Sequence, residues 1–161
     1  QNKYKDPELN PLFTFAVAGY NMRSGEINAV LGLEQIKRLD YNIEKRRKNL
    51  DIWLNSLDKD KYFVNFLVEG NSSFALPLIL KDGDKMTKIC EILDEESIEY
   101  RIGTAGGGNQ ARQPYLKKHE FRIAGDMDNS NFIHNCGLYI GNHIKVTEAE
   151  ILSICEKLNK I

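Results

Sequence analysis

The strongest pattern along the chain is a long helical one. From about Gly25 to Leu57, apolar residues recur at steps of three and four positions, the spacing of one face of an α-helix, and no proline interrupts them. A helix of about 30 residues spans roughly 45–50 Å, longer than a small domain, unless it bends or breaks near Asp40. We therefore expect part of this helix to reach beyond the domain. Its apolar positions are Ile36, Leu39, Ile43, Leu50, Trp53 and Leu57.

Two runs of strand-forming residues follow this helix. They are Tyr62 to Val68 and Ser73 to Lys81, and the Gly70-Asn71 pair between them is typical of a turn. This arrangement predicts an antiparallel hairpin. Pro77 has no N–H to donate to a neighbouring strand, so we expect the second strand at an edge of the sheet or at a bulge.

Two further amphipathic helices are predicted in the second half of the chain. The first is indicated by Met86, Ile89, Cys90 and Leu93, which stand at i, i+3, i+4 and i+7. The second begins at Thr147, because Thr147 and Glu150 have the spacing of a capping box. Its apolar face is predicted to bury Ile151, Ile154, Cys155 and Leu158.

Short strands are predicted at Glu99–Ile102 and Leu138–Gly141, and one helical turn at Ser130–Asn135, ended by Gly137. Strands joined by hairpins and interspersed with helices indicate an α+β fold, with a largely antiparallel sheet flanked by helices. Residues 1–24 contain two prolines and little periodicity, so we interpret them as a connector. Residues 25–161 then form one domain that includes the long connecting helix.

Composition narrows the classes of function. The chain has 161 residues, of which 42% are hydrophobic and 28% charged, typical of an ordinary globular domain. Its 22 basic and 23 acidic residues nearly cancel, which disfavours binding to nucleic acid or to an anionic membrane. No window approaches the ~20 apolar residues of a membrane span. Three cysteines without a CxxC pair indicate neither disulfides nor zinc, and we expect a cytoplasmic protein.

A glycine-rich segment, Arg101 to Pro114, is the best intrinsic candidate for ligand contact. Glycines let the backbone approach a ligand closely, and Arg101 and Arg112 can each hold a phosphate or carboxylate through two hydrogen bonds. The segment is neither a Walker loop nor a dinucleotide-binding fingerprint. From the residues alone, a solvent-exposed loop is an equal alternative.

A second candidate lies just before the long helix, where Asn21 and Arg23 occupy a polar turn. A helix N-terminus favours an anion, so phosphate binding is one interpretation, and a capping asparagine beside a surface arginine is the other. The three histidines show no metal-ligand spacing, and we expect no bound metal. Cys136, close to His134, has the residue type of a nucleophile, but a buried packing role is the commoner one.

Four segments resemble the DegT/StrS family of pyridoxal-phosphate-dependent nucleotide-sugar aminotransferases and sugar 3-dehydratases. The Gly19–Arg23 turn with its continuation Gln35–Leu39 is similar to a pattern found throughout that family. The other three segments resemble the branch that acts on CDP- or GDP-linked 4-keto-6-deoxyhexoses. They are Glu69–Phe74, Ala105–Pro114 and Ile133–His143. One departure is the third glycine in Gly106-Gly107-Gly108, because the family pattern has a tighter Ala-Gly-Asn turn.

The resemblance implies the small C-terminal domain of a fold-type I pyridoxal-phosphate-dependent transferase. In that family a large N-terminal domain holds the coenzyme, as pyridoxal or pyridoxamine phosphate, and a homodimer shares its two active sites. Asn21 and Arg23 then match the segment that binds the coenzyme phosphate. Arg101, Asn109, Arg112 and His134 match segments near the nucleotide-sugar pocket. No catalytic residue falls within this chain, and we expect the chain alone not to retain the coenzyme.

The implied reaction is a dehydration in surface-polysaccharide (O-antigen) biosynthesis. The amino form of the coenzyme would condense with the C4 ketone of the sugar, and its ring would accept electrons during loss of the C3 hydroxyl. An aminotransferase of the same family is the first alternative. A non-catalytic interaction module is the second, since a long charged helix often serves association and no complete catalytic set is present.

Overall fold

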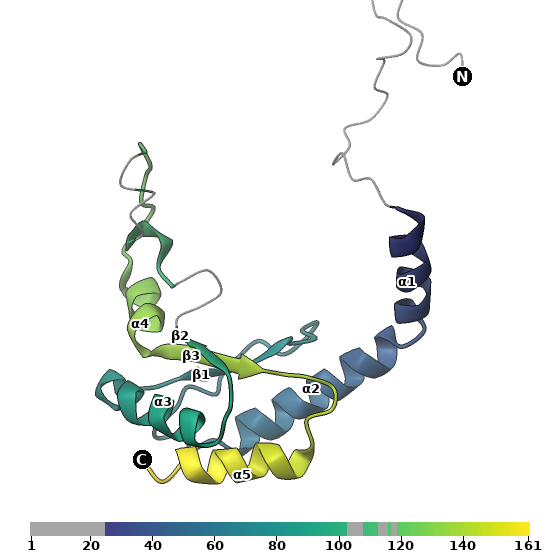
Figure 1. Ribbon diagram of the computed structural model, residues 1–161. Helices are drawn as coiled ribbons and strands as arrows, with labels where there is room; N and C mark the ends of the chain where they lie inside the picture. The colour runs from purple at the N-terminus through teal and green to yellow at the C-terminus, as the bar shows by residue number, and fades with distance from the viewer. Residues whose placement is uncertain (1–24, 103–107, 113–115, 117–118) are drawn as a thin grey trace, which may run out of the picture. The chain divides into compact units, whose positions relative to one another are not determined.

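The structure is a computed structural model that describes residues 25–102, 108–112, 116 and 119–161. The chain divides into two compact units, Gln1–Arg38 and Leu39–Ile161. The described part of the first unit contains helix α1, Glu26–Ile36. The second unit contains helices α2 (Leu39–Ser56), α3 (Met86–Glu95), α4 (Asp128–Cys136) and α5 (Glu148–Leu158), with strands β1 (Ala75–Ile79), β2 (Tyr100–Ile102) and β3 (Gly137–Gly141) (Figure 1).

The long helical run is present, but it is divided at Lys37-Arg38. There the Arg38 N–H donates to the carbonyl of Gln35 at 3.0 Å, a bond to the third residue back, so the regular helical ladder stops. This break lies close to Asp40, where the sequence analysis allowed for a bend or break of the helix. None of the α1 residues is buried, and Ile27 is 78% exposed. The buried residues of the run lie in α2 and at Leu57, which directly follows it.

The three strands form an antiparallel sheet in the order β1-β3-β2, which confirms the predicted α+β architecture. β1 stands at an edge, as Pro77 requires. The Pro77 carbonyl, on the side away from β3, accepts a hydrogen bond from Trp53 Nε1 of α2 at 2.7 Å. A carbonyl on the outer edge of β1 is therefore hydrogen-bonded by a side chain of helix α2.

The predicted hairpin is wrong beyond its first residue pair. Tyr62 and Leu80 form an isolated antiparallel bridge, and Phe63 N–H donates to the Ile79 carbonyl at 2.9 Å. The rest of 62–68 makes no ladder. On its other edge β1 pairs with β3, whose Leu138 and Ile140 supply buried side chains on the same face as its own. The partner that forms a ladder with β1 is thus the strand far along the chain, and the run next to it in sequence contributes only the single bridge.

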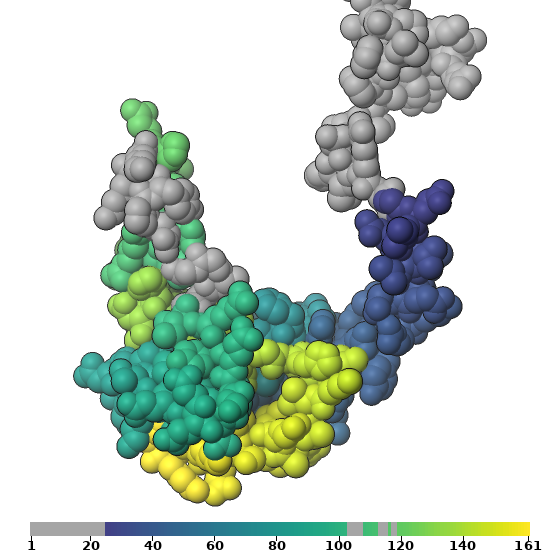
Figure 2. All heavy atoms as spheres, viewed as in Figure 1, coloured from purple at the N-terminus to yellow at the C-terminus, as the bar shows by residue number. Residues whose placement is uncertain are grey.

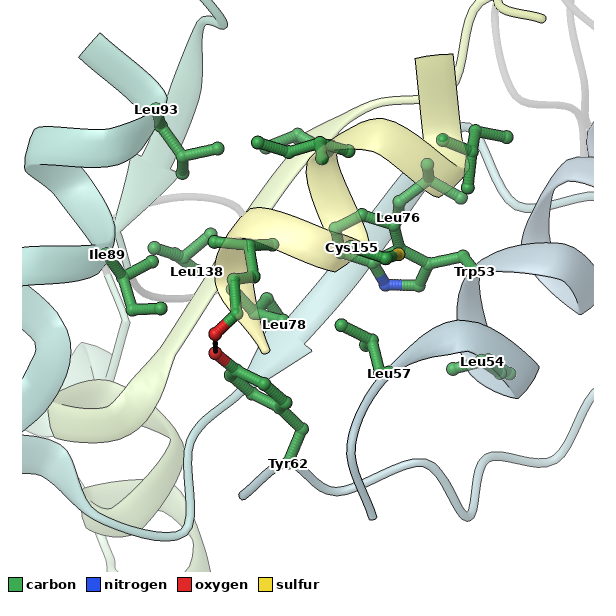
Figure 3. Close-up of a cluster of buried hydrophobic side chains, with 14 of the residues drawn as sticks. Trp53, Leu54, Leu57, Tyr62, Leu76, Leu78, Ile89, Leu93, Leu138 and Cys155 are labelled. Carbon is green, nitrogen blue, oxygen red and sulfur yellow. Dashed lines mark hydrogen bonds between the residues drawn. The ribbon is translucent and has the colours of Figure 1, made fainter. Parts of the chain in front are cut away.

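One hydrophobic core lies between the sheet and the helices α2, α3 and α5. Alternate residues of β1 and β3 point into it, and the predicted faces of α3 and α5 cover it. Figure 2 shows α3 and α5 meeting in a continuous outer surface. Tyr62 closes one end of the core, where its hydroxyl donates to the Leu158 carbonyl at 2.7 Å (Figure 3). The core includes Leu50, Trp53, Leu57, Leu76, Leu78, Ile89, Leu93, Leu138, Ile140, Ile151, Ile154 and Leu158.

The last helix begins as its sequence predicts. Thr147 Oγ1 accepts from the Glu150 N–H, and the Glu150 carboxylate accepts from the Thr147 N–H, so the capping box is complete. These hydrogen bonds to the charged form hold the pKa of Glu150 below its usual value. The capping box therefore fixes the first turn of α5, on which the helix's alignment with the core depends.

A buried asparagine pair joins α2 to the sheet. Asn142, just after β3, is 2% exposed, and its amide donates to the carbonyls of Arg46 and Ser73 at 3.0 and 2.9 Å. Its Oδ1 accepts from Asn49 Nδ2 at 3.0 Å, and Asn49 is fully buried. Three segments far apart in sequence are thereby held by one side chain.

We predict that Asn142→Ala lowers the free energy of unfolding by about 2–4 kcal/mol, because it leaves a buried amide and two carbonyls without their partner. Urea denaturation followed by circular dichroism would measure it. The control is Asn55→Ala, which removes only an exposed bond to Asp51 and should change stability by about 0.5 kcal/mol or less. Equal effects of the two substitutions would contradict the proposed role of Asn142.

Candidate functional site

The turn at residues 108–112 is attached to helix α4 by its asparagine. The backbone N–H of Asn109 donates to His134 Nδ1 at 3.1 Å, and its side-chain amide donates to Asn131 Oδ1 at 2.9 Å. The Asn109 Oδ1 accepts from the Ala111 N–H at 3.0 Å, which closes the turn. Asn109 is only 7% exposed. Three of its polar groups are therefore used to fix the shape and position of the turn.

Helix α4 provides these partners from one face. His134 and Asn135 lie three and four residues after Asn131, so both side chains project from the side of the helix that carries Asn131. Asn135 Oδ1 lies 3.3 Å from Nη1 of Arg112, which is exposed. The structure thus brings together three of the residues predicted near a nucleotide-sugar pocket, Asn109, Arg112 and His134.

The bond from Asn109 also fixes the tautomer of His134. A ring nitrogen that accepts a hydrogen bond carries no proton, so the neutral imidazole bears its proton on Nε2. His134 then offers an N–H donor from a half-buried ring. This donor can bind a hydroxyl or phosphate oxygen of a ligand.

Gly108 is required at the start of the turn. Its φ is +77°, in the left-handed region, and a Cβ built on it would lie 2.1 Å from His134 Nδ1. The backbone can approach the imidazole only because no side chain is present. The last glycine of Gly106–Gly108 therefore sets the position of Asn109, whereas Gly106 and Gly107 lie outside the described residues.

Arg101 is not part of the group formed by Asn109, Arg112 and His134, and it lines a separate hollow. It stands on β2 opposite Tyr139 of β3, and its Nη2 is 3.8 Å from Glu99 Oε1. Both side chains are largely exposed, so this ion pair contributes little to stability. The hollow is also lined by Phe74, Tyr100 and Gly141. The predicted site is therefore two separate features of one domain and not a single cluster.

The structure supports the packing interpretation of the cysteines. Cys136 is buried, and its burial, with Asp82 and Asp84 nearby, raises the pKa of the thiol. Burial raises the pKa of Cys155 to about 12. A thiol that resists ionisation is a poor nucleophile. Among the described residues, no group of three or more histidine, cysteine or acidic side chains has the arrangement of a metal site.

Asn21 and Arg23 lie outside the described residues. The structure begins close to them, at Gly25, which is the N-cap of α1. Glycine has no side chain with which to cap a helix, whereas serine or asparagine would supply an acceptor. In the part of the chain that the structure covers, no helix is both long and apolar enough to cross a membrane.

Residues that pattern analysis missed complete the site. Asn131 and Asn135 were not predicted as site residues, although an Asn-x-x-His-Asn pattern on a predicted helical turn places three polar side chains on one face. Gly108 was noted only as part of the glycine run that departs from the family pattern. The helical turn predicted at Ser130–Asn135 extends over nine residues as α4.

The comparisons agree with the family resemblance. A profile described as the DegT/DnrJ/EryC1/StrS aminotransferase family matches residues 4–159. The chain is 34% identical over 134 residues to a GDP-4-keto-6-deoxy-D-mannose 3-dehydratase of Yersinia pseudotuberculosis. The matched region covers 81% of this chain and 34% of that relative. A dehydratase of the same description from Escherichia coli O55:H7 is 30% identical over 141 residues, covering 86% of the chain and 36% of the relative.

Solved structures show the same relationship. The E. coli GDP-4-keto-6-deoxy-D-mannose 3-dehydratase with bound hydrated PLP superposes with a TM-score of 0.76 at 28% identity, over 94% of this chain and 40% of that one. A ColD variant with bound GDP-perosamine gives 0.75 at 29% identity, over 91% and 38%. The predicted fold of a small domain of a pyridoxal-phosphate enzyme is thus confirmed. The chain spans about a third of the length of the curated relatives it matches.

We predict that Gly108→Ala separates the turn from α4, because the added Cβ would overlap His134 Nδ1. The Asn109 amide should exchange with solvent at least tenfold faster, as measured by NMR hydrogen exchange. Gly125→Ala is a matched control, since Gly125 also has a positive φ, +78°, but a Cβ added there would meet nothing within 4 Å. If both variants leave Asn109 protected, the steric requirement at Gly108 is wrong.

Proposed function

Because the chain belongs to the DegT/DnrJ/EryC1/StrS aminotransferase family, we propose that it is the C-terminal part of a coenzyme-dependent sugar dehydratase. The reaction is removal of the C3 hydroxyl from a nucleotide-linked 4-keto-6-deoxyhexose, in the cytoplasm, during surface-polysaccharide biosynthesis. The observation that carries the proposal is the 34% identity to a 3-dehydratase over 81% of this chain. The relative named lipopolysaccharide biosynthesis protein RfbH, from Salmonella typhimurium, supports the same process.

The part of this chain in the reaction is to hold the substrate. Arg112 uses one guanidinium nitrogen on Asn135, and its remaining N–H groups suit the two-pronged binding of a diphosphate oxygen pair. The Nε2–H of His134 is a neutral donor for a phosphate or sugar oxygen. Since Asn109 fixes both the turn and the imidazole, these two donors are preorganised relative to each other.

The coenzyme would be held at the other end of the chain. Asn21 and Arg23 would bind its phosphate, just before a helix N-terminus that no side chain caps. When bound, pyridoxamine phosphate supplies an amine for the ketone and a ring that accepts electrons. The residue that acts as base, and the acid that pairs with the pyridine nitrogen, would come from a coenzyme domain that precedes this chain. In a homodimer, Asn21 and Arg23 would reach the partner's coenzyme.

An aminotransferase of the same family is the second candidate. A UDP-4-amino-4,6-dideoxy-N-acetyl-β-L-altrosamine transaminase of Campylobacter jejuni is 31% identical to this chain, but over only 65 residues, 38% of its length. The dehydratases match more than twice that share of the chain. A non-catalytic association module is the third candidate, favoured by the exposed apolar residues of α1, including Leu31 and Leu33.

The proposal is tested by identifying the residue that faces the coenzyme in the full-length protein. A dehydratase of this kind has histidine there, whereas an aminotransferase needs lysine to bind the coenzyme covalently. Reading the coding sequence upstream of Gln1 and treating coenzyme-loaded enzyme with borohydride both report it. We expect histidine and no covalent trapping. A reducible lysine adduct would establish the aminotransferase instead, and a protein with no coenzyme domain would leave only the association module.

In the coenzyme-binding enzyme, we predict that Arg23→Ala weakens coenzyme affinity about tenfold to a hundredfold. A charge-assisted hydrogen bond to phosphate contributes about 1.5–3 kcal/mol, and its loss affects binding more than folding. Coenzyme absorbance during equilibrium dialysis would measure the affinity. Arg38→Ala is the control, because Arg38 is an exposed arginine beyond the end of α1. Unchanged affinity in the Arg23 variant would remove this residue from the coenzyme site.

A further inference from the structure

The side-chain amide of Asn109 has a fixed orientation. Its Oδ1 accepts a hydrogen bond from the backbone N–H of Ala111 at 3.0 Å. A backbone N–H can only donate, so the oxygen of the amide must face Ala111, and the Nδ2 group must face the other way. The atom that meets Nδ2 must therefore be a hydrogen-bond acceptor.

Asn131 supplies this acceptor from helix α4. Its Oδ1 lies 2.9 Å from Asn109 Nδ2, and Asn109 is only 7% exposed, so water has little access to the contact. A variant without an acceptor at position 131 would leave a nearly buried amide donor unsatisfied, which is costly. Only the oxygen of Asn131 takes part in this contact, so a carboxylate of the same shape could replace the amide.

The backbone N–H of the same asparagine is directed at the imidazole of His134, 3.1 Å from Nδ1. A peptide N–H cannot exchange the roles of donor and acceptor, as a hydroxyl can, so this bond requires an Nδ1 without a proton. The proton of the neutral ring is then on Nε2. The position of the Asn109 backbone thus determines what the imidazole offers to a ligand.

The two contacts depend on each other because both partners lie on one helix. Asn131 and His134 are three residues apart on α4, and side chains at that spacing are neighbours on a helix surface. They hold Asn109 from two directions, one through its side chain and the other through its backbone. Loss of the side-chain contact would free the turn to move and turn the Asn109 N–H away from Nδ1.

We propose that Asn131 is a positioning residue for His134. By accepting from Asn109 Nδ2, it keeps the Asn109 N–H on Nδ1, and so it holds the imidazole as a donor at Nε2. The inference rests on the proposed function for the identity of the ligand, since such a donor suits a phosphate oxygen of a nucleotide sugar. The other tautomer would present a lone pair at Nε2 and repel that oxygen. The same arrangement excludes His134 as a base toward the ligand, because its Nε2 already carries a proton.

NMR of the ¹⁵N-labelled chain at about pH 8, where histidine is ordinarily neutral, tests the proposal. An N–H···N hydrogen bond transmits a scalar coupling between its two nitrogens, so we expect a coupling between the Asn109 amide nitrogen and His134 Nδ1. The ring should show one bare nitrogen, Nδ1, and one protonated nitrogen, Nε2. Asn131→Leu should abolish the coupling and bring the two ring resonances closer together. It should also speed exchange of the Asn109 amide about tenfold, as expected for a lost hydrogen bond.

Asn131→Asp is the conservative variant, which keeps the acceptor oxygen and should retain both the coupling and the two ring resonances. Asn129→Leu is the matched control, because Asn129 is an exposed asparagine of the same helix, and it should leave every readout unchanged. Circular dichroism would confirm that each variant folds.

Three outcomes would each overturn the proposal: no coupling in the wild type, a coupling retained in the leucine variant, or a coupling lost in the aspartate variant. The first and third decide it even where the leucine variant fails to fold. These readouts need neither coenzyme nor nucleotide sugar, so an aminotransferase outcome in the coenzyme test would leave them unaffected.

Discussion

The close contact at Gly137 is the constraint on which the rest of the domain depends. Helix α4 ends at Cys136 and strand β3 begins at the next residue, so the chain changes from helix to strand without a loop. A Cβ at Gly137 would lie 2.6 Å from the carbonyl oxygen of Ile133, which no other residue type can accommodate there. The direct junction places the polar face of α4 and the central strand of the sheet in a fixed relation.

Both parts of the candidate site follow from this junction. On its helical side, Asn131, His134 and Asn135 hold the turn that contains Asn109 and Arg112. On its strand side, Tyr139 and Gly141 line the hollow that also contains Arg101. Because β3 is the central strand, its position is fixed by hydrogen bonds on both sides. A binding surface built on such a strand is more rigid than one built on loops alone.

Side chains of strand β3 alternate between the core and the opposite face of the sheet. Leu138 and Ile140 complete the core, whereas Tyr139 and Gly141 line the hollow that contains Arg101. Cys136 and Cys155 belong to the core, and burial raises the pKa of both thiols. The buried Asn49–Asn142 pair then attaches α2 to the end of this same strand. The proposed substrate-binding groups and the core are thus supported by the same few residues.

The sequence by itself determined the features that depend on local periodicity and turn chemistry. Helices α3 and α5, the capping box at Thr147, the antiparallel sheet and the edge position of Pro77 were all predictable, as was the family, because its segments are contiguous. The pairing of β1 was not. The 62–68 run has the composition of a strand, but it meets the end of β1 only at one bridge, and the ladder of β1 is formed with β3, a segment far along the chain that no local pattern identifies as its partner.

The same distinction holds for the candidate site. The family resemblance identified Asn109, Arg112 and His134 as candidates, but only the tertiary structure showed that an imidazole accepts the Asn109 N–H, and that Gly108 is needed for this contact. It also placed Arg101 in another hollow, beside Glu99 and Tyr139. Local patterns fix which side chains share a face of one element. Contacts between elements depend on how distant segments pack, and no spacing along the chain encodes that directly.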